Sequence, residues 1–142
     1  MTGAVVDANV ILKLLVDQPM TANAREVVKK YDLTAPALIL AEVANALLTY
    51  VRAGSTSNKH AARSLMRLEQ RAIDLHPIDQ ALTREAFAIG LTLTHPIYDC
   101  FYLALARRMS APFITADLKF YRKAAAAGFD VLNLAEISGE AP

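Results

Sequence analysis

The chain has 142 residues, of which 54% are apolar and 20% charged, with 15 basic and 14 acidic side chains and one cysteine. This composition excludes a disordered protein, an internal disulfide framework and a cysteine-rich zinc site. No uncharged apolar stretch reaches the roughly 18 residues of a membrane span, and the first segment lacks the features of a signal peptide. We therefore expect a cytoplasmic protein without a membrane partner.

Strand and helix patterns alternate along the chain. Short apolar runs predict strands at residues 3–6, 33–35, 72–76, 112–115 and 131–134. Apolar periodicity and turn residues predict helices at 9–16, 21–31, 37–52, 58–70, 80–91, 97–108 and from Asp117 to 127. Pro36 fits the first turn of the 37–52 helix. The alternation predicts an α/β fold, an α/β/α sandwich with a mainly parallel central sheet. We expect one domain over 1–136 and a loose tail at 137–142.

Four acidic residues stand apart from the other charges of the chain, namely Asp7, Glu42, Asp99 and Asp117. Each is the only charged side chain in a long apolar stretch, and Asp7, Glu42 and Asp99 have no lysine or arginine within one helical turn. An unpaired carboxylate that is removed from water loses several kcal/mol of solvation. These acids therefore predict a compensating cation.

The predicted elements bring these acids to one edge of the sheet. Asp7 and Asp117 directly follow predicted strands, and the carboxyl ends of parallel strands border the crevice of an open α/β sheet. Glu42 and Asp99 lie in early turns of helices that such strands feed. Carboxylates that converge there form a hard oxygen site suited to Mg²⁺ or Mn²⁺. The pattern thus indicates metal-assisted phosphoryl transfer.

Four short motifs resemble those of a known family. They are Val-Val-Asp-Ala-Asn at 5–9, Ala-Glu-Val-Ala-Asn at 41–45, Tyr-Asp-Cys-Phe-Tyr-Leu-Ala-Leu-Ala at 98–106 and Ile-Thr-Ala-Asp at 114–117. In this order they resemble the acidic motifs of PIN-domain nucleases, and most of all those of the VapC-type toxins of bacterial toxin–antitoxin modules. The resemblance runs from Val5 to about Leu134, and the 98–106 motif is its most specific part.

The resemblance implies a Mg²⁺-dependent (or Mn²⁺-dependent) endoribonuclease that is the toxin of a toxin–antitoxin pair. It implies that the metal is gathered by Asp7, Glu42, Asp99 and Asp117. Asp7 and Asp99 are the expected direct ligands. Asn9 and Thr115 match polar positions that orient the carboxylates or the attacking water.

The resemblance also implies partners. These are an RNA substrate, a second copy of the chain in a homodimer, and a cognate antitoxin whose C-terminal segment covers the acidic crevice. We expect the apolar surface of the helical hairpin at 37–70 to help receive that segment. Lys119, Arg122 and Lys123 follow Asp117 and are candidates for RNA-backbone contacts, because phosphate contacts carry much of the affinity for RNA. Each of them can equally be an ordinary solvated residue.

The acids also have simpler interpretations. Asp7, Asp99 and Asp117 could each serve only as a cap or a favourable charge at a helix N-terminus. Glu42 is harder to explain in that way, because it lies inside an apolar helix. Asn45 shares a helix face with Glu42 and could either hydrogen-bond that carboxylate or be an exposed polar residue.

Two other functions stay open. Residues 5–10 loosely match the first motif of haloacid-dehalogenase-like phosphatases, in which Asp7 would be a covalent phosphoryl acceptor. Asn9 argues against this function, since an amide cannot act as a general acid. The third possibility is a catalytically inactive binding module whose acids only stabilise the fold.

Three side chains near the acids have structural interpretations. Cys100 is expected to be a small buried apolar residue. His95, at the start of a helix before a proline, is expected to have a structural role rather than to bind metal. Tyr102 lies at core spacing in its helix and is expected to pack in the core.

Overall fold

The computed structural model describes residues 1–138, which form one five-stranded sheet, seven α-helices and a short 3₁₀ helix. In chain order the elements are β1 (Thr2–Val6), α1 (Ala8–Leu15), α2 (Thr21–Lys30), β2 (Tyr31–Pro36), α3 (Leu38–Arg52), α4 (Asn58–Glu69), β3 (Ile73–His76), α5 (Gln80–Leu93), α6 (Ile97–Met109), β4 (Phe113–Thr115), α7 (Leu118–Ala126), β5 (Val131–Asn133) and η1 (Leu134–Glu136). Every predicted strand and helix forms, and the observed ends lie within two residues of the predicted ends.

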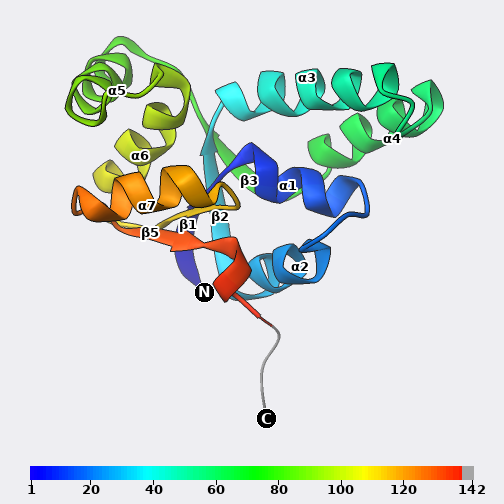
Figure 1. Ribbon diagram of the computed structural model, residues 1–142, viewed down its shortest axis with the longest axis horizontal. Helices are drawn as coiled ribbons and strands as arrows, with labels where there is room; N and C mark the ends of the chain where they lie inside the picture. The colour runs from blue at the N-terminus through cyan, green and yellow to red at the C-terminus, as the bar shows by residue number, and fades with distance from the viewer. Residues whose placement is uncertain (139–142) are drawn as a thin grey trace.

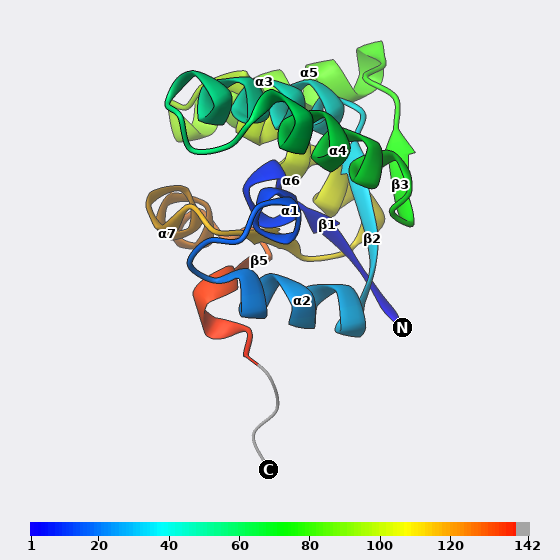
Figure 2. The same ribbon diagram turned by 90° about the vertical axis from the view of Figure 1, so that its right-hand side faces the viewer.

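The sheet is wholly parallel and its strand order is β3-β2-β1-β4-β5. The chain moves outward from β1 to β3, then crosses back to β4 and β5. Right-handed crossovers therefore place α1 to α4 on one face and α5 to α7 on the other. Figure 1 shows the first group to the right of the strands and the second to the left, and Figure 2 shows the right-hand group from the front. The predicted α/β/α sandwich is confirmed.

The junction between β2 and α3 differs from the prediction. Pro36 is the last residue of β2 and pairs with His76, and the N–H of Ala37 donates to the carbonyl of His76 at 2.8 Å. The placement of Pro36 in the first helical turn was therefore wrong. Pro36 fits the strand because β1 pairs with β2 only as far as Thr34, so its missing N–H interrupts no ladder on that side.

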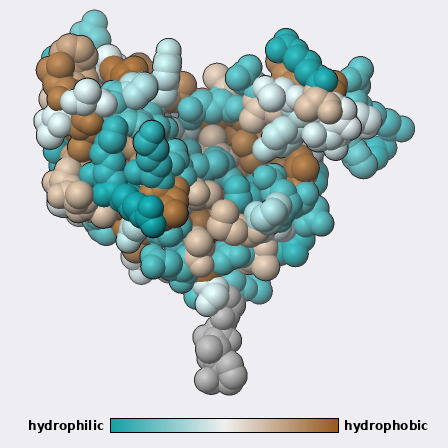
Figure 3. Space-filling model, in the orientation of Figure 1, coloured by the Kyte–Doolittle hydropathy of each residue, from teal (hydrophilic) through white to brown (hydrophobic). Residues whose placement is uncertain are grey.

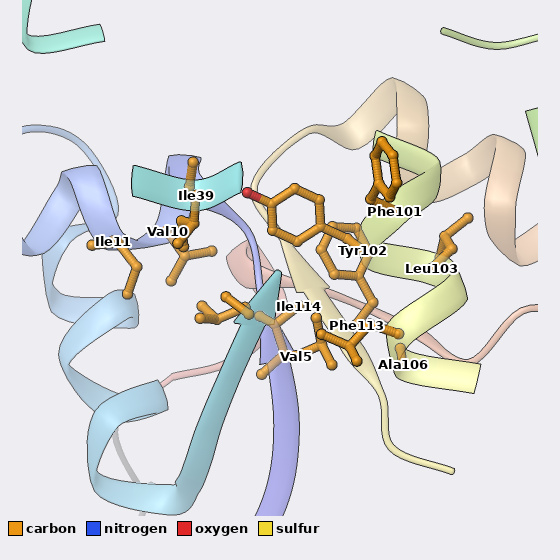
Figure 4. Packing of buried hydrophobic residues seen from close by; sticks show 14 of the residues in the cluster. Val5, Val10, Ile11, Ile39, Phe101, Tyr102, Leu103, Ala106, Phe113 and Ile114 are labelled. Atoms are coloured by element: carbon orange, nitrogen blue, oxygen red, sulfur yellow. The ribbon is translucent and has the colours of Figure 1, made fainter. Parts of the chain in front are cut away.

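Helix α6 forms the centre of the core. All its residues from 100 to 106 are buried, and it contacts β1, β2 and β4. The ring of Tyr102 packs 5.4 Å from the ring of Phe113, and Figure 4 shows both between α6 and the strands that carry Val5 and Ile114. This packing on both β1 and β4 fixes α6 relative to the middle of the sheet.

The last described residues lie against α2. The Asn23 Nδ2 donates to the carbonyl of Ile137 at 2.8 Å, and the Lys30 Nζ donates to that of Ser138 at 3.1 Å. The rest of the predicted tail, 139–142, lies outside the described residues. Within residues 1–138, none of the helices combines the length and the apolar character that a membrane crossing requires.

Candidate active site

The acidic residues lie near the boundary between β1 and β4. At this boundary the strand order switches, because β2 and β3 follow on one side of β1 and β4 and β5 lie on the other. Asp7 follows β1, and the N–H of Asp7 donates to the carbonyl of Ile114 on β4 at 3.0 Å. Asp117 follows β4, Glu42 lies in the second turn of α3, and Asp99 lies in the first turn of α6. Such a switch point is the usual ligand site of an open α/β sheet. Figure 3 shows the surface hollowed between the arm of α5 and α6 and the arm of α3 and α4.

Asp7 is the most buried of the four acids, with 7% of its surface exposed. Its side chain makes no capping hydrogen bond to α1, although it stands at the N-cap position. Burial, together with the negative charges of Asp99 and Glu42, raises the pKa of Asp7 to about 7, although a hydrogen bond from Thr115 opposes the rise. These contacts argue against a simple helix cap.

Thr115 connects the ends of β1 and β4. Its Oγ1 donates to Oδ2 of Asp7 at 2.8 Å, and it accepts from Nδ2 of Asn9 at 3.3 Å and from the N–H of Asp117 at 3.0 Å. The Oδ1 of Asn9 in turn accepts from the N–H of Ala116 at 3.1 Å. Asn9 and Thr115 therefore hold the Asp7 carboxylate and the loop before α7 in one network.

We expect Thr115→Val to destabilise the protein by about 1–3 kcal/mol, because valine keeps the shape but leaves the buried carboxylate of Asp7 and the backbone N–H of Asp117 without their partner. Thr115→Ser keeps the hydroxyl and should stay close to the wild type. Urea unfolding of the three proteins measures the difference. Equal stability of the valine and serine variants would contradict the role given to this hydroxyl.

Asp117 differs from the other acids because it is exposed. Its Oδ1 accepts from the N–H of Phe120 at 3.0 Å and so caps α7. Asp117 therefore caps α7, and the expectation that all four acids are taken out of water does not apply to it. The physical reason is that β4 ends at Thr115, so Asp117 lies in the connection between β4 and α7 rather than in the sheet.

Glu42 is half-buried and is held by a residue that the sequence interpretation assigned only to packing. The hydroxyl of Tyr102 donates to Oε1 of Glu42 at 2.5 Å. Burial raises the pKa of Glu42 and Asp99 adds to the rise, while the Tyr102 hydrogen bond opposes it. Tyr102 lies three residues after Asp99 on α6, and this spacing on one helix face is the signal that could have linked it to the acids.

Asn45 does not join this group. It is exposed, and no hydrogen bond connects its side chain with Glu42. Of the two interpretations left open for Asn45, the structure therefore favours the exposed polar residue.

Asp99 is held by His95, which the sequence interpretation had set aside. The Nε2 of His95 lies 2.7 Å from Oδ2 of Asp99, and the two side chains are 18% and 31% exposed. The Nζ of Lys123 reaches Nδ1 of His95 at 3.2 Å, and the imidazole stacks on Phe120 with the ring centroids 4.5 Å apart. His95 precedes Asp99 by four residues but lies in the turn before α6, so the conformation of that turn, rather than helical spacing, brings the two side chains together.

The basic residues near the site fall into two groups. Lys119 and Arg122 are exposed, as RNA-contacting or merely solvated residues would both be. Lys123 is engaged with His95, and Lys13 donates to the carbonyl of Asn9 at 3.3 Å. Burial lowers the pKa of Lys13, and the negative charge of Asp7 opposes that effect. Lys13 is thus a cation near Asp7 that the sequence interpretation missed.

Cys100 is buried next to Asp99, and its Sγ approaches the carbonyl of Pro96 at 3.5 Å. Burial, together with the negative charge of Asp99, raises the pKa of this thiol to about 11. The group is therefore a thiol at neutral pH and a poor nucleophile.

The carboxylate oxygens at this site are of the type that a hard cation prefers, although they are not gathered closely around one point. Asp7, Glu42 and Asp99 lie within one another's electrostatic influence, and no lysine or arginine among residues 1–138 forms an ion pair with any of them. In the same part of the chain no three acidic, histidine or cysteine side chains lie close enough together to enclose one metal ion. Each carboxylate instead has its own protein donor, from Thr115, Tyr102 and His95 respectively.

The chain is similar to known proteins both in sequence and in fold. It is 31% identical over 122 residues to Ribonuclease VapC3 of Pyrobaculum aerophilum, a match covering 84% of this chain and 92% of that protein. Its fold is similar to a toxin–antitoxin complex from Klebsiella pneumoniae (TM-score 0.70, 17% identity, 93% of this chain and 98% of that one). It is also similar to Mycobacterium tuberculosis VapC20, described as a sarcin-ricin loop cleaving toxin (TM-score 0.67, 14% identity, 89% and 96%). The family model of the PIN domain matches residues 4–126, and the chain therefore belongs to the PIN-domain family.

Proposed function

We propose that the protein is a Mg²⁺-dependent or Mn²⁺-dependent endoribonuclease that hydrolyses RNA phosphodiester bonds. One observation carries this proposal: three carboxylates, those of Asp7, Glu42 and Asp99, share the switch point of the sheet without an arginine or lysine ion pair. A buried carboxylate whose pKa is raised to about 7 is stabilised by a cation at neutral pH. The 31% identity to a protein named a ribonuclease supports RNA as the substrate.

In this proposal Asp7 and Asp99 are direct metal ligands, and Glu42 and Asp117 complete the negative charge around them. A bound divalent cation supplies activation of the attacking water and neutralisation of the scissile phosphate. Thr115 and Asn9 hold the Asp7 carboxylate and the β4 end in register, and Tyr102 holds Glu42. The exposed Lys119 and Arg122 are proposed to contact the RNA backbone.

The proposed biological role is that of a toxin neutralised by a cognate antitoxin. The similarity to a solved toxin–antitoxin complex supports such a partner. The hairpin of α3 and α4 carries an apolar groove of about 360 Å³, lined by Ala44, Leu47, Leu48, Val51, Asn58, Ala61, Ala62 and Leu65. Leu48 there is 53% exposed, as expected of a surface that receives apolar side chains of another segment. The homodimer and the cytoplasmic location stay predictions.

The two other functions fit the site less well. A phosphatase of the haloacid-dehalogenase type needs a proton donor two residues after its nucleophile, whereas both ends of the Asn9 amide are engaged by Thr115 and Ala116. An inactive binding module gives no reason for keeping a carboxylate buried at Asp7, where burial disfavours its charged form. The PIN-domain match favours the nuclease over both.

The test is cleavage of total RNA by the purified protein. We expect cleavage with Mg²⁺ or Mn²⁺, loss of cleavage in excess EDTA, and recovery when the divalent cation is added back, because the carboxylates need the cation to bind a phosphate. Mapping the cut ends then gives the preferred sequence. Cleavage that persists in EDTA would contradict the metal dependence, and release of inorganic phosphate from a small phosphomonoester without RNA cleavage would favour the phosphatase.

A further inference from the structure

We propose that His95 is a positioning residue that holds the Asp99 carboxylate in place, and that Lys123 fixes the tautomer in which His95 does so. The inference rests on the proposed function, in which Asp99 is a metal ligand. It concerns three side chains from different parts of the fold: Lys123 on α7, His95 in the connection between α5 and α6, and Asp99 in the first turn of α6.

The tautomer follows from the donors and acceptors around the ring. A lysine ammonium has three N–H donors and no acceptor, so the nitrogen that it contacts must be unprotonated. Because Nζ of Lys123 lies 3.2 Å from Nδ1 of His95, the ring proton belongs on Nε2. The Nε2–H is then the donor to Oδ2 of Asp99 at 2.7 Å. The Lys123 ammonium at Nδ1 thus directs the Nε2–H of His95 to the carboxylate of Asp99.

The backbone conformation around His95 fixes the position of its ring. Thr94 caps α5 in the left-handed conformation, with φ of 51°, and the N–H of His95 donates to the carbonyl of Gly90 at 3.2 Å. A Cβ at Gly90 would lie 3.2 Å from the carbonyl of His95, so the turn passes too close to α5 for a larger residue to fit without movement. Lys123 also contacts the carbonyl of Thr94 at 3.5 Å, which ties α7 to the same turn.

The ring itself is packed on a rigid support. Its centroid lies 4.5 Å from that of Phe120, a residue that is 1% exposed, and the ring of Phe120 in turn meets that of Phe113 of β4 edge to face. The position of His95 is therefore tied to the sheet that carries Asp7 and Thr115. An Asp99 side chain with 31% exposure and no other donor among residues 1–138 would otherwise be free to change rotamer.

The consequence is that one oxygen of Asp99 is held by the protein while Oδ1 keeps its lone pairs for another ligand. Groups that orient a metal-binding side chain in this way typically contribute about 10-fold to 100-fold to metal affinity or activity. His95 is thus expected to act through Asp99 without touching substrate. The proposal also gives Lys123 a positioning role, in place of the RNA-backbone contact expected from the sequence.

Three variants separate the hydrogen bond from the stacking. His95→Phe keeps an aromatic ring for Phe120 but has no donor, and His95→Asn has a donor that is too short to replace Nε2. His95→Gln can place an amide N–H near the position of Nε2. We expect His95→Phe and His95→Asn to lower Mn²⁺ affinity in calorimetric titration, and RNA cleavage, by about 10-fold to 100-fold, and His95→Gln to stay within about fivefold of the wild type. His60→Phe, on the exposed face of α4, is the matched control and should change neither.

The tautomer is tested without metal or RNA. Nitrogen-15 NMR of the imidazole in metal-free wild-type protein should show Nε2 protonated and Nδ1 unprotonated, and Lys123→Met should reduce this preference. A ring protonated on Nδ1 would overturn the proposal, as would wild-type Mn²⁺ affinity in a folded His95→Phe variant. If the wild type binds Mn²⁺ but cleaves no RNA, the proposed ribonuclease function fails, while the NMR and Mn²⁺ titrations still decide the role of His95.

Discussion

Replacing Asp7 or Asp99 with asparagine is expected to lower RNA cleavage about a thousandfold, which corresponds to about 4 kcal/mol of activation free energy. Each substitution removes one negative charge from a group in which the carboxylates raise one another's pKa. Asparagine is nearly the same size and can still accept the hydrogen bonds from Thr115 and His95. The substitutions should therefore weaken cation binding and the catalysis that depends on the cation, and leave the fold unchanged.

The measurement is single-turnover cleavage of one mapped RNA substrate at saturating Mg²⁺, with circular dichroism to show that each variant is folded. Asp74→Asn is the matched control, because Asp74 is an exposed acid on the edge strand β3. It should cleave like the wild type. If folded Asp7→Asn and Asp99→Asn variants both keep wild-type rates, the proposed metal ligands are wrong.

The same Asp7→Asn substitution is expected to stabilise the metal-free protein at pH 8 by up to about 4 kcal/mol. Burial raises the pKa of Asp7 from an ordinary value of 3.8 to about 7 in the folded state. The folded state therefore binds the proton more tightly than the unfolded chain between these values. The contribution of Asp7 to stability is fully present below about pH 4 and is lost as the pH rises through about 7.

Chemical unfolding in EDTA at a series of pH values checks this expectation. The free energy of unfolding of the wild type should fall between about pH 4 and about pH 7, and that of Asp7→Asn should fall less, so that the two proteins differ little at pH 4 and most at pH 8. Mg²⁺ at pH 8 should restore stability to the wild type and not to the variant, since a cation that binds only the folded state stabilises it. Identical pH dependence of the two proteins would contradict a raised pKa at Asp7.

An Asp7→Asn variant that is more stable and less active would show that the Asp7 carboxylate serves catalysis at the expense of stability. Natural sites often keep charges that reduce stability because the chemistry needs them. The opposite outcome, an Asp7→Asn protein that is both inactive and less stable at pH 8, would point to a structural role for the carboxylate through Thr115.

The sequence alone determined the architecture, because the local patterns agree with one another. Apolar β-branched runs such as the one that contains Val5 and Val6 are too short for helices and therefore predict buried strands. The segments between these runs have the regular apolar spacing of helices rather than the polar composition of loops. Alternating strands and helices then leave few arrangements other than a parallel sheet covered on both faces. Pro36 was misplaced because a proline suits both the end of a strand and the start of a helix.

The sequence also singled out the acids, because a carboxylate in an apolar stretch is conspicuous without any structure. It did not show their surroundings. Asp117 looked as isolated as Asp7, yet Asp117 is exposed and caps α7, while Asp7 is buried. The difference comes from their positions: Asp7 directly follows the central strand β1, on which α6 packs, and its carboxylate is covered by Thr115, whereas Asp117 lies two residues beyond the end of β4 at the N-cap of α7.

Only the tertiary structure decided which side chains hold the acids. Thr115 meets Asp7 across 108 residues, Tyr102 meets Glu42 across 60, and Lys123 meets His95 across 28. Hydrogen bonds of this kind depend on angles and distances within a few tenths of an ångström, whereas a sequence pattern specifies only the face of a helix or strand. The sequence thus predicted that acidic side chains gather at the carboxyl ends of the strands, and the packing of α6 and α7 on the sheet decided how each carboxylate is held.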